Sequence, residues 1–253
     1  MLHPCAADAP TKPTRSATCL RLSASSPEMT VPEQTQIWAH HARFTKMIPS
    51  AMPRLFARLY DAPFYRTMHE KWLDTLPLAG KETALDIGCG PGGLSGALAA
   101  RGLEVTGLDR SDDMVAMAQQ REQGGSASFV QGDAAALPCA ESSFDVAMCS
   151  SLLNIVDDPA PVLQEMARVL RPKGIISVLL PDPTLTEAAA LAHSRSADLP
   201  DEDAALLLLW ASKAPKISLA KAISWFTAEG MTRPKQDPLL DGLVHVTTWG
   251  SPA

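Results

Sequence analysis

The sequence predicts an α/β protein built on a doubly wound, mostly parallel sheet. From Thr83 onward, short apolar runs alternate with stretches of helical periodicity, a pattern typical of βαβ units. The first apolar run leads into clustered glycines, as where a buried strand turns tightly into a helix. With 253 residues, of which 46% are apolar and 20% charged, the chain can form one principal domain.

The chain opens with a segment that we expect to be a disordered tail, residues 1–30, rich in Pro, Ser, Thr and Ala. It lacks the apolar stretch of a secretory signal. Its basic, Ser-rich composition is typical of an organelle transit peptide, but its prolines disfavour the amphipathic helix of one. A translation start at Met29 instead of Met1 would explain it equally well. Between residues 33 and 76, apolar residues recur at helical intervals interrupted by prolines, which predicts two or three short helices.

The core should contain five strands separated by three helices. The apolar runs predict strands at Ala84–Ile87, Glu104–Leu108, Ala127–Gln131, Phe144–Cys149 and Ile175–Leu180, with helices near 93–101, 112–123 and 159–170. Right-handed crossovers between such strands produce half of a doubly wound fold.

After the fifth strand, Thr184–Pro215 is too apolar for a plain loop and predicts an inserted helical lid, with an acidic stretch that keeps one side solvated. A helix at Ser218–Glu229 and two strand-like runs ending in LVHVTTW follow. We therefore expect one domain over residues 31–253, divided into a helical cap at 31–80, a core at 81–183, a lid at 184–217 and a C-terminal helix and strands at 218–253.

Composition argues against several classes of function. A net charge of -6 with scattered Lys and Arg provides no basic surface for nucleic acid. No apolar run approaches the roughly 20 residues that span a bilayer. The five cysteines lack CxxC spacing and His partners, so we expect no metal site, and free thiols suit a cytoplasmic protein. The expected partner is a small molecule, and the oligomeric state is open.

The strongest local motif is LDIGCGPGGLS at residues 85–95. Nicotinamide and flavin enzymes also use a glycine turn, to hold a pyrophosphate at a helix N-terminus. Here Asp86 would repel a pyrophosphate and attract a ligand with an ammonium and a sulfonium, such as S-adenosylmethionine (AdoMet). Asp109 ends the second strand, where a carboxylate can accept both ribose hydroxyls. Asp133 is placed to accept from the adenine amino group, and Ala134 to donate its amide to the ring.

Five segments resemble, in order and spacing, the class I AdoMet-dependent methyltransferase family, above all its ubiquinone and menaquinone biosynthesis type. They are LDIGCGPGG, VTGLDRSDDMV, GDAAALP, FDVAMCSSLLNIVDDP and LQEMARVLRPKGIISV, and they cover residues 83–181. The resemblance implies a Rossmann-like, doubly wound sheet of seven strands with an antiparallel last strand, and AdoMet as the cofactor. It departs from the family at Asn154 and Ile155, where members often carry a His pair, and in reading RPKG for KPGG.

The resemblance also implies cofactor-binding residues at the carboxyl ends of the first four strands. The methionine end would lie against Asp86, Gly88, Cys89, Gly90 and Gly92; the ribose against Asp109; the adenine against Asp133 and Ala134, with Arg110 and Met114 beside the adenosine; and Cys149 and Ser150 would contact the methionine portion and open toward the acceptor. Met114 fits a core position equally well. Asp112 and Asp113 most simply stabilise a helix N-terminus after a Ser111 cap.

Methyl transfer from a sulfonium is an in-line displacement in a dry site and requires no metal. A hydroxyl acceptor would benefit from a general base, for which His193 in the lid is our best single candidate, ahead of His40, His41, His69, Tyr60 and Tyr65. The apolar lid and the aromatic N-terminal segment predict a pocket for an apolar or aromatic acceptor, with Tyr60, Asn154, His193 and Trp210 as candidate contacts. The acceptor itself and the methylated atom (O, N, S or C) are open.

Two alternatives from other classes stay open. A catalytically silent protein of the same fold, acting as a regulatory or assembly partner, would keep the cofactor site without the chemistry. A nicotinamide-dependent oxidoreductase is less favoured, because the sequence has no Tyr-x-x-x-Lys pair and places Asp86 where phosphates would lie.

Overall fold

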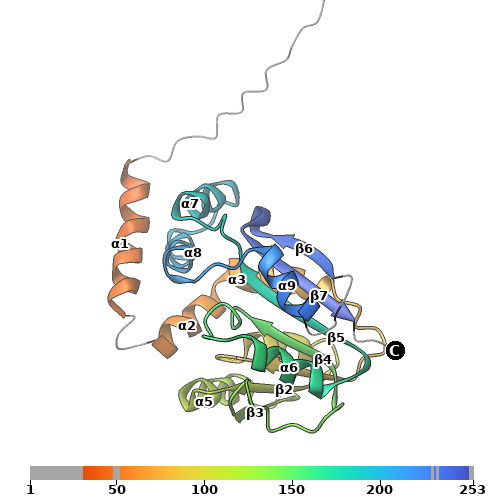
Figure 1. The fold of residues 1–253 in the computed structure, drawn as a ribbon. Helices are drawn as coiled ribbons and strands as arrows, with labels where there is room; N and C mark the ends of the chain where they lie inside the picture. The colour runs from red at the N-terminus through yellow and green to blue at the C-terminus, as the bar shows by residue number, and fades with distance from the viewer. Residues whose placement is uncertain (1–30, 48–51, 229–230, 232–233, 251–253) are drawn as a thin grey trace, which may run out of the picture.

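The computed structural model describes residues 31–47, 52–228, 231 and 234–250 (Figure 1). The expected disordered tail and the question of a start at Met29 lie outside these residues.

Seven strands in the described residues form one sheet in the order β3-β2-β1-β4-β5-β7-β6. Strand β7 is antiparallel to both of its neighbours and the others are parallel, as predicted. Strand β5 begins earlier than expected because Leu170 already pairs with Phe144 before the RPKG turn. The strands are β1 Thr83–Ile87, β2 Glu104–Asp109, β3 Ala127–Gln131, β4 Phe144–Ser150, β5 Leu170–Pro181, β6 Lys235–Leu239 and β7 Val244–Gly250.

The helices begin and end where local chemistry predicts. Pro63 starts α3, a position that needs no amide donor. The Ser111 hydroxyl accepts from the Met114 amide at the start of α5, so the expected cap is confirmed. The helices are α1 Val31–Met47, α2 Met52–Asp61, α3 Pro63–Asp74, α4 Gly93–Ala99, α5 Asp112–Arg121, α6 Ala160–Val169, α7 Glu187–Ser196, α8 Asp201–Lys213 and α9 Leu219–Ala228, with a short 3-10 turn, η1, at Leu240–Gly242.

Both faces of the sheet are covered, as in a doubly wound fold (Figure 1). On one face, α6 and α9 pack against alternate residues of β1, β4 and β5, including Leu85, Ala147 and Ile176. On the other face, a larger core joins Val105, Val146 and the N-terminal helices to α7 and α8. Because α1, α2 and α3 belong to this larger core, the N-terminal segment is part of the folded unit.

Helix α3 is fixed to the sheet by buried polar side chains. The Trp72 indole donates to the Ser177 hydroxyl on β5 at 2.8 Å, and Ser177 is 2.7 Å from the Thr248 hydroxyl on β7. Since an unpaired buried donor is costly, these hydrogen bonds hold α3 in one register along the sheet.

The insertion after β5 is helical, as predicted. Its second helix, α8, lacks the solvent-exposed acidic side that we expected. Every side chain of α8 from Asp203 to Ala211 is buried. Helix α8 packs against α1 and α7, which cover it together (Figure 1). An ion pair between Arg58 and Glu202 also ties α2 to the start of α8. The expected exposed acidic face is therefore wrong at Asp203, because sequence periodicity does not reveal a second covering layer.

Replacing Leu207 by Ala tests this placement of α8. Leu207 is 0% exposed, so we expect the free energy of unfolding to fall by about 2–5 kcal/mol in chemical denaturation. As a control, Ile155→Ala removes a side chain that is 59% exposed, and the change should stay within roughly 0.5 kcal/mol. A Leu207→Ala loss as small as that of the control would contradict the buried position of α8.

Candidate functional site

Strand β1 ends in a turn of left-handed glycines at the carboxyl edge of the sheet. Gly88, Gly90 and Gly92 have φ of +72°, +52° and +84°. A Cβ on Gly92, the N-cap of α4, would lie 2.9 Å from Cβ of Ala118, so a larger residue would be both strained and crowded there. The Gly88 and Cys89 amides donate to the Leu108 carbonyl at 2.7 and 2.9 Å, which joins the turn to β2.

Acidic side chains surround this turn, because β3, β2 and β1 are neighbours and end at the same edge. Asp109 accepts from the Gly90 amide through Oδ2 and from the Ser111 amide through Oδ1, both at 2.9 Å. Each oxygen keeps a second lone pair for a ligand hydroxyl. Asp133, beyond β3, is exposed and accepts from the Ala135 amide through Oδ1 at 2.9 Å.

Asp86 is the buried acid of the site. Its carboxyl is 1% exposed and accepts from the Ser95 hydroxyl at 2.6 Å. Burial raises the pKa of Asp86 to about 7, and the nearby charge of Asp109 contributes in the same direction. No Lys, Arg or His in the described part of the chain forms an ion pair with Asp86. A ligand that brings a positive charge would therefore stabilise the ionised form.

Aromatic residues from α2, α3 and α8 cover the turn. The Tyr60 ring is 3.6 Å from where a Cβ of Gly90 would lie. Its ring centroid is 5.0 Å from that of Tyr65, and Tyr65 is 5.4 Å from Trp210 on α8. Gly90 is consequently buried rather than exposed at the surface. Burial raises the pKa of both tyrosines, so they are uncharged near neutral pH.

The end of β4 carries a second group of contacts. His69 Nε2 lies 3.0 Å from the Ser150 hydroxyl. Burial lowers the pKa of His69 to about 3, so its ring is neutral at physiological pH. Ser151 has φ +53°, a strained conformation of the kind that gathers at functional sites. Sequence reasoning missed Ser151, because nothing in the letters Ser-Ser reports its backbone angle.

The structure gathers most of the predicted cofactor-binding residues. Asp86, the glycines, Cys89 and Asp109 lie at the ends of β1 and β2, and Cys149 and Ser150 at the end of the adjoining β4. Burial raises the pKa of both thiols, so neither is charged. Ala134 follows β3, Arg110 is exposed after β2, and Met114 is buried on α5.

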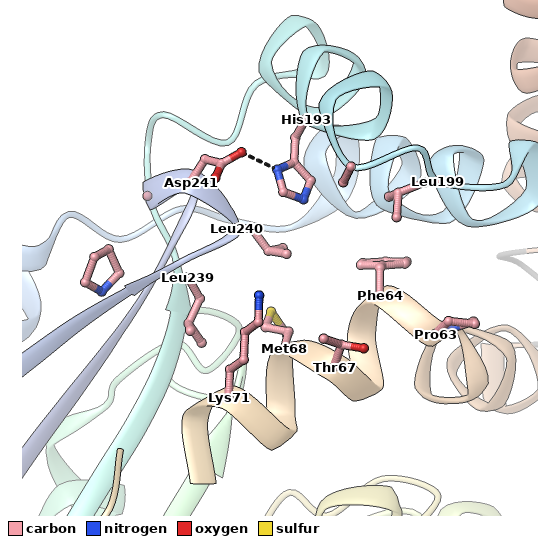
Figure 2. Close-up of a pocket in the computed structure, with 13 residues that line it drawn as sticks. Pro63, Phe64, Thr67, Met68, Lys71, His193, Leu199, Leu239, Leu240 and Asp241 are labelled. Atoms are coloured by element: carbon pink, nitrogen blue, oxygen red, sulfur yellow. Dashed lines mark hydrogen bonds and ion pairs between the residues drawn. The ribbon is translucent and has the colours of Figure 1, made fainter. Parts of the chain in front are cut away.

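The candidate acceptor residues do not all lie together. Tyr60 and Trp210 belong to the aromatic cover, whereas the Asn154 amide donates to the Pro215 carbonyl at 3.0 Å. His193 lies in a separate pocket, where its Nδ1 is 2.7 Å from Asp241 Oδ2 (Figure 2). Of the other candidate bases, His69 is at the site, while His40 and His41 are on α1. The structure thus brings His69, and not His193, to the glycine turn.

Within the described residues, no cluster of His, Cys, Asp and Glu could hold a metal ion. In the same part of the chain, no helix is long and apolar enough to cross a membrane.

Comparison with known sequences shows what this arrangement is similar to. Residues 85–178 match the family model described as a methyltransferase domain. A trans-aconitate 2-methyltransferase from Methylobacterium nodulans is 35% identical over 63% of this chain and 61% of its own length. A ubiquinone biosynthesis O-methyltransferase from Pseudomonas putida is 39% identical over 44% of this chain and 51% of its own length. The chain thus spans less than two thirds of each relative.

Solved structures share the fold. A magnesium protoporphyrin IX methyltransferase from Synechocystis, with SAH bound, aligns at a TM-score of 0.60 and 18% identity over 81% of this chain and 97% of that one. An S-adenosylmethionine dependent methyltransferase from Mesorhizobium loti aligns at 0.56 and 18% identity, covering 76% and 99%. Identities this low establish the similarity of the fold alone.

The raised pKa of Asp86 predicts how stability depends on pH. The folded protein keeps a proton on Asp86 that the unfolded chain, with a pKa of 3.8, has released. The stabilisation is complete below pH 3.8 and is lost as the pH rises through about 7. Relative to Asp86→Asn, the wild type should lose up to about 1.4 kcal/mol per pH unit in this window. Denaturation curves for both proteins from pH 4 to 8 would measure it, and parallel pH profiles would contradict the buried, raised pKa.

Proposed function

We propose, from the premise that the chain belongs to the class I AdoMet-dependent methyltransferase family, that it transfers a methyl group from AdoMet to a small-molecule acceptor. The observation that carries the proposal is the buried Asp86, which has no ion-pair partner among the described residues and lies near Asp109 at a turn of left-handed glycines. This turn excludes side chains and concentrates negative charge. A nucleotide pyrophosphate would be repelled there, whereas a cationic ligand that carries a ribose suits it.

The residues fit AdoMet by the chemistry of their donors and acceptors. Asp86 would complement the positive charge of the methionine end, Asp109 would accept from the ribose hydroxyls, and Asp133 with Ala134 would pair with the adenine. When bound, AdoMet supplies an activated methyl group. The protein contributes alignment and a dry site, which the aromatic cover of Tyr60, Tyr65 and Trp210 favours.

The acceptor side favours a molecule that is already ionised. His69, with its pKa lowered to about 3, is a weak base, and Tyr60 and Tyr65 keep their protons near neutral pH. A carboxylate or an acidic phenol needs no base. A neutral His69 also adds no positive charge beside a sulfonium, and through its contact with Ser150 it acts as a positioning residue. The names of the two relatives, an O-methyltransferase and a trans-aconitate methyltransferase, support oxygen as the accepting atom.

Two measurements test the proposal. Calorimetry with AdoMet, S-adenosylhomocysteine (SAH) and NADH should give binding of the first two only. Turnover is then measured on a panel of aromatic and aliphatic carboxylates, acidic phenols and neutral alcohols. Binding of AdoMet without turnover across the panel would favour the catalytically silent alternative. Binding of NADH alone would favour the oxidoreductase.

Asp109→Asn should weaken AdoMet binding by about 1–3 kcal/mol, because an amide replaces the charged acceptor for the ribose. Asn is preferred to Ala because it retains an oxygen for one of the two backbone amides, those of Gly90 and Ser111, that donate to Asp109. Glu104→Gln, an exposed carboxylate at the opposite end of β2, is the matched control and should leave the dissociation constant unchanged. Equal affinities in calorimetry for Asp109→Asn and Glu104→Gln would remove Asp109 from the cofactor site.

The acceptor panel also tests the absence of a strong base. Rates for neutral phenols should rise with pH and follow the ionisation of each phenol, while rates for carboxylates should be flat between pH 7.5 and 9. His69→Gln should lower kcat on both classes without changing the slope of the phenol profile, as expected of a positioning residue. If His69→Gln abolished turnover of neutral phenols and spared carboxylates, His69 would be the general base instead.

A further inference from the structure

A cavity of about 640 Å³ lies between α3, α7 and the turn that joins β6 to β7 (Figure 2). Its walls are mainly apolar, with Phe64 and Met68 from α3 on one side and Leu239 and Leu240 on the other. This volume is in the range of small-molecule sites. Nothing in the proposed methyl transfer uses it.

Helix α3 separates this cavity from the glycine turn. Phe64, Met68 and Lys71 follow one another at intervals of four and three residues and share the face that lines the cavity. Tyr65, His69 and Trp72 repeat the same spacing one position later, on a face rotated by about 100°. That second face contacts Ser150 and Ser177 on the sheet. One helix therefore contributes to two distinct sites.

Four polar side chains reach the cavity, those of Thr67, Lys71, His193 and Asp241. The Lys71 ammonium points into it (Figure 2), and Lys71 has no ion-pair partner among the described residues. His193 contacts Asp241 through Nδ1 at 2.7 Å, which leaves Nε2 available to a ligand. Leu240 and Asp241 hold φ of +47° and +56° in the turn, a strained conformation that presents Asp241 to His193.

We propose that this cavity is a second ligand site, for a monocarboxylate with an apolar or aromatic body and a hydroxyl group. The carboxylate would pair with Lys71, the body would lie between Phe64, Met68 and Leu239, and the hydroxyl would donate to His193 Nε2. Asp241 accepts from Nδ1–H and so makes Nε2 the acceptor of the neutral ring. A phosphate dianion suits the cavity poorly, because one ammonium faces it and the Asp241 carboxylate is nearby.

The experiment uses 4-hydroxyphenylacetate as the probe, in calorimetry with the full chain, first without SAH and then with saturating SAH. We expect a binding step that is roughly tenfold weaker in Lys71→Met, since this variant loses a charge-assisted contact, whereas a step that Lys71→Met leaves unchanged belongs to the methyl-acceptor site. Lys71→Arg should retain binding. Lys221→Met, which removes a lysine from α9 on the other face of the sheet, should match the wild type. The neutral analogue tyrosol, which lacks the carboxylate, should bind as weakly to the wild type as the probe does to Lys71→Met.

Three results would overturn the proposal. They are no saturable binding to the wild type, equal binding to Lys71→Met and wild type, or expulsion of the probe by SAH. Thermal midpoints of the variants show whether a loss of probe binding is caused by unfolding. If Lys71→Met unfolds, the comparison of Lys71→Arg and of tyrosol with the wild type and the probe tests the proposal instead. Probe binding to Asp109→Asn separates this proposal from methyl transfer, because a failure of the cofactor site would leave the second site intact.

Discussion

The site depends on the attachment of the glycine turn to the end of β2. Two amides of the turn donate to the Leu108 carbonyl, and the Gly90 amide donates to Asp109. These contacts require left-handed backbone at Gly88 and Gly90, which only glycine adopts without strain. They also hold Asp109 near enough to Asp86 for its charge to raise the pKa of the Asp86 carboxyl. The hydrogen bonds that shape the turn therefore also place the Asp109 carboxylate at the site.

The N-terminal helices complete the site by covering the glycine turn and the end of β4. Helix α2 contributes Tyr60 over the turn, and α3 contributes Tyr65 and His69 toward β4. Since α1, α2 and α8 share one apolar core, the cover is held by packing and not only by local contacts. Residues remote from the core motifs in sequence thus cover the site, and under the proposed function they would contribute to the specificity for the acceptor.

The sequence predicted the fold well where one physical signal dominates. Buried strands such as Phe144–Ser150, expected at Phe144–Cys149, and the Ser111 cap follow from apolar runs and local hydrogen bonding, and they lie where expected or within one residue of it. Sequence patterns did not contain the information needed to choose between His193 and His69 as the candidate general base. Both are single histidines on helices, and only the packing of α3 decides that His69 reaches Ser150 while His193 pairs with Asp241. The burial of Asp203 likewise depends on a segment distant in sequence, the start of α3, where Phe64 interacts with its carboxylate.

The hydrogen bonds that fix α3 to the sheet determine which part of the aromatic cover over the glycine turn can move. Sliding α3 would deprive the Trp72 indole of its buried acceptor, Ser177, whereas α2 reaches the turn through the Tyr60 ring and is held by that ring's contact with Tyr65. Access to the backbone of Gly90 therefore requires the Tyr60 ring to move while α3 keeps its place on the sheet. The observed affinity of any ligand that contacts the Gly90 backbone is then reduced by the free energy needed to move the Tyr60 ring out of its buried position.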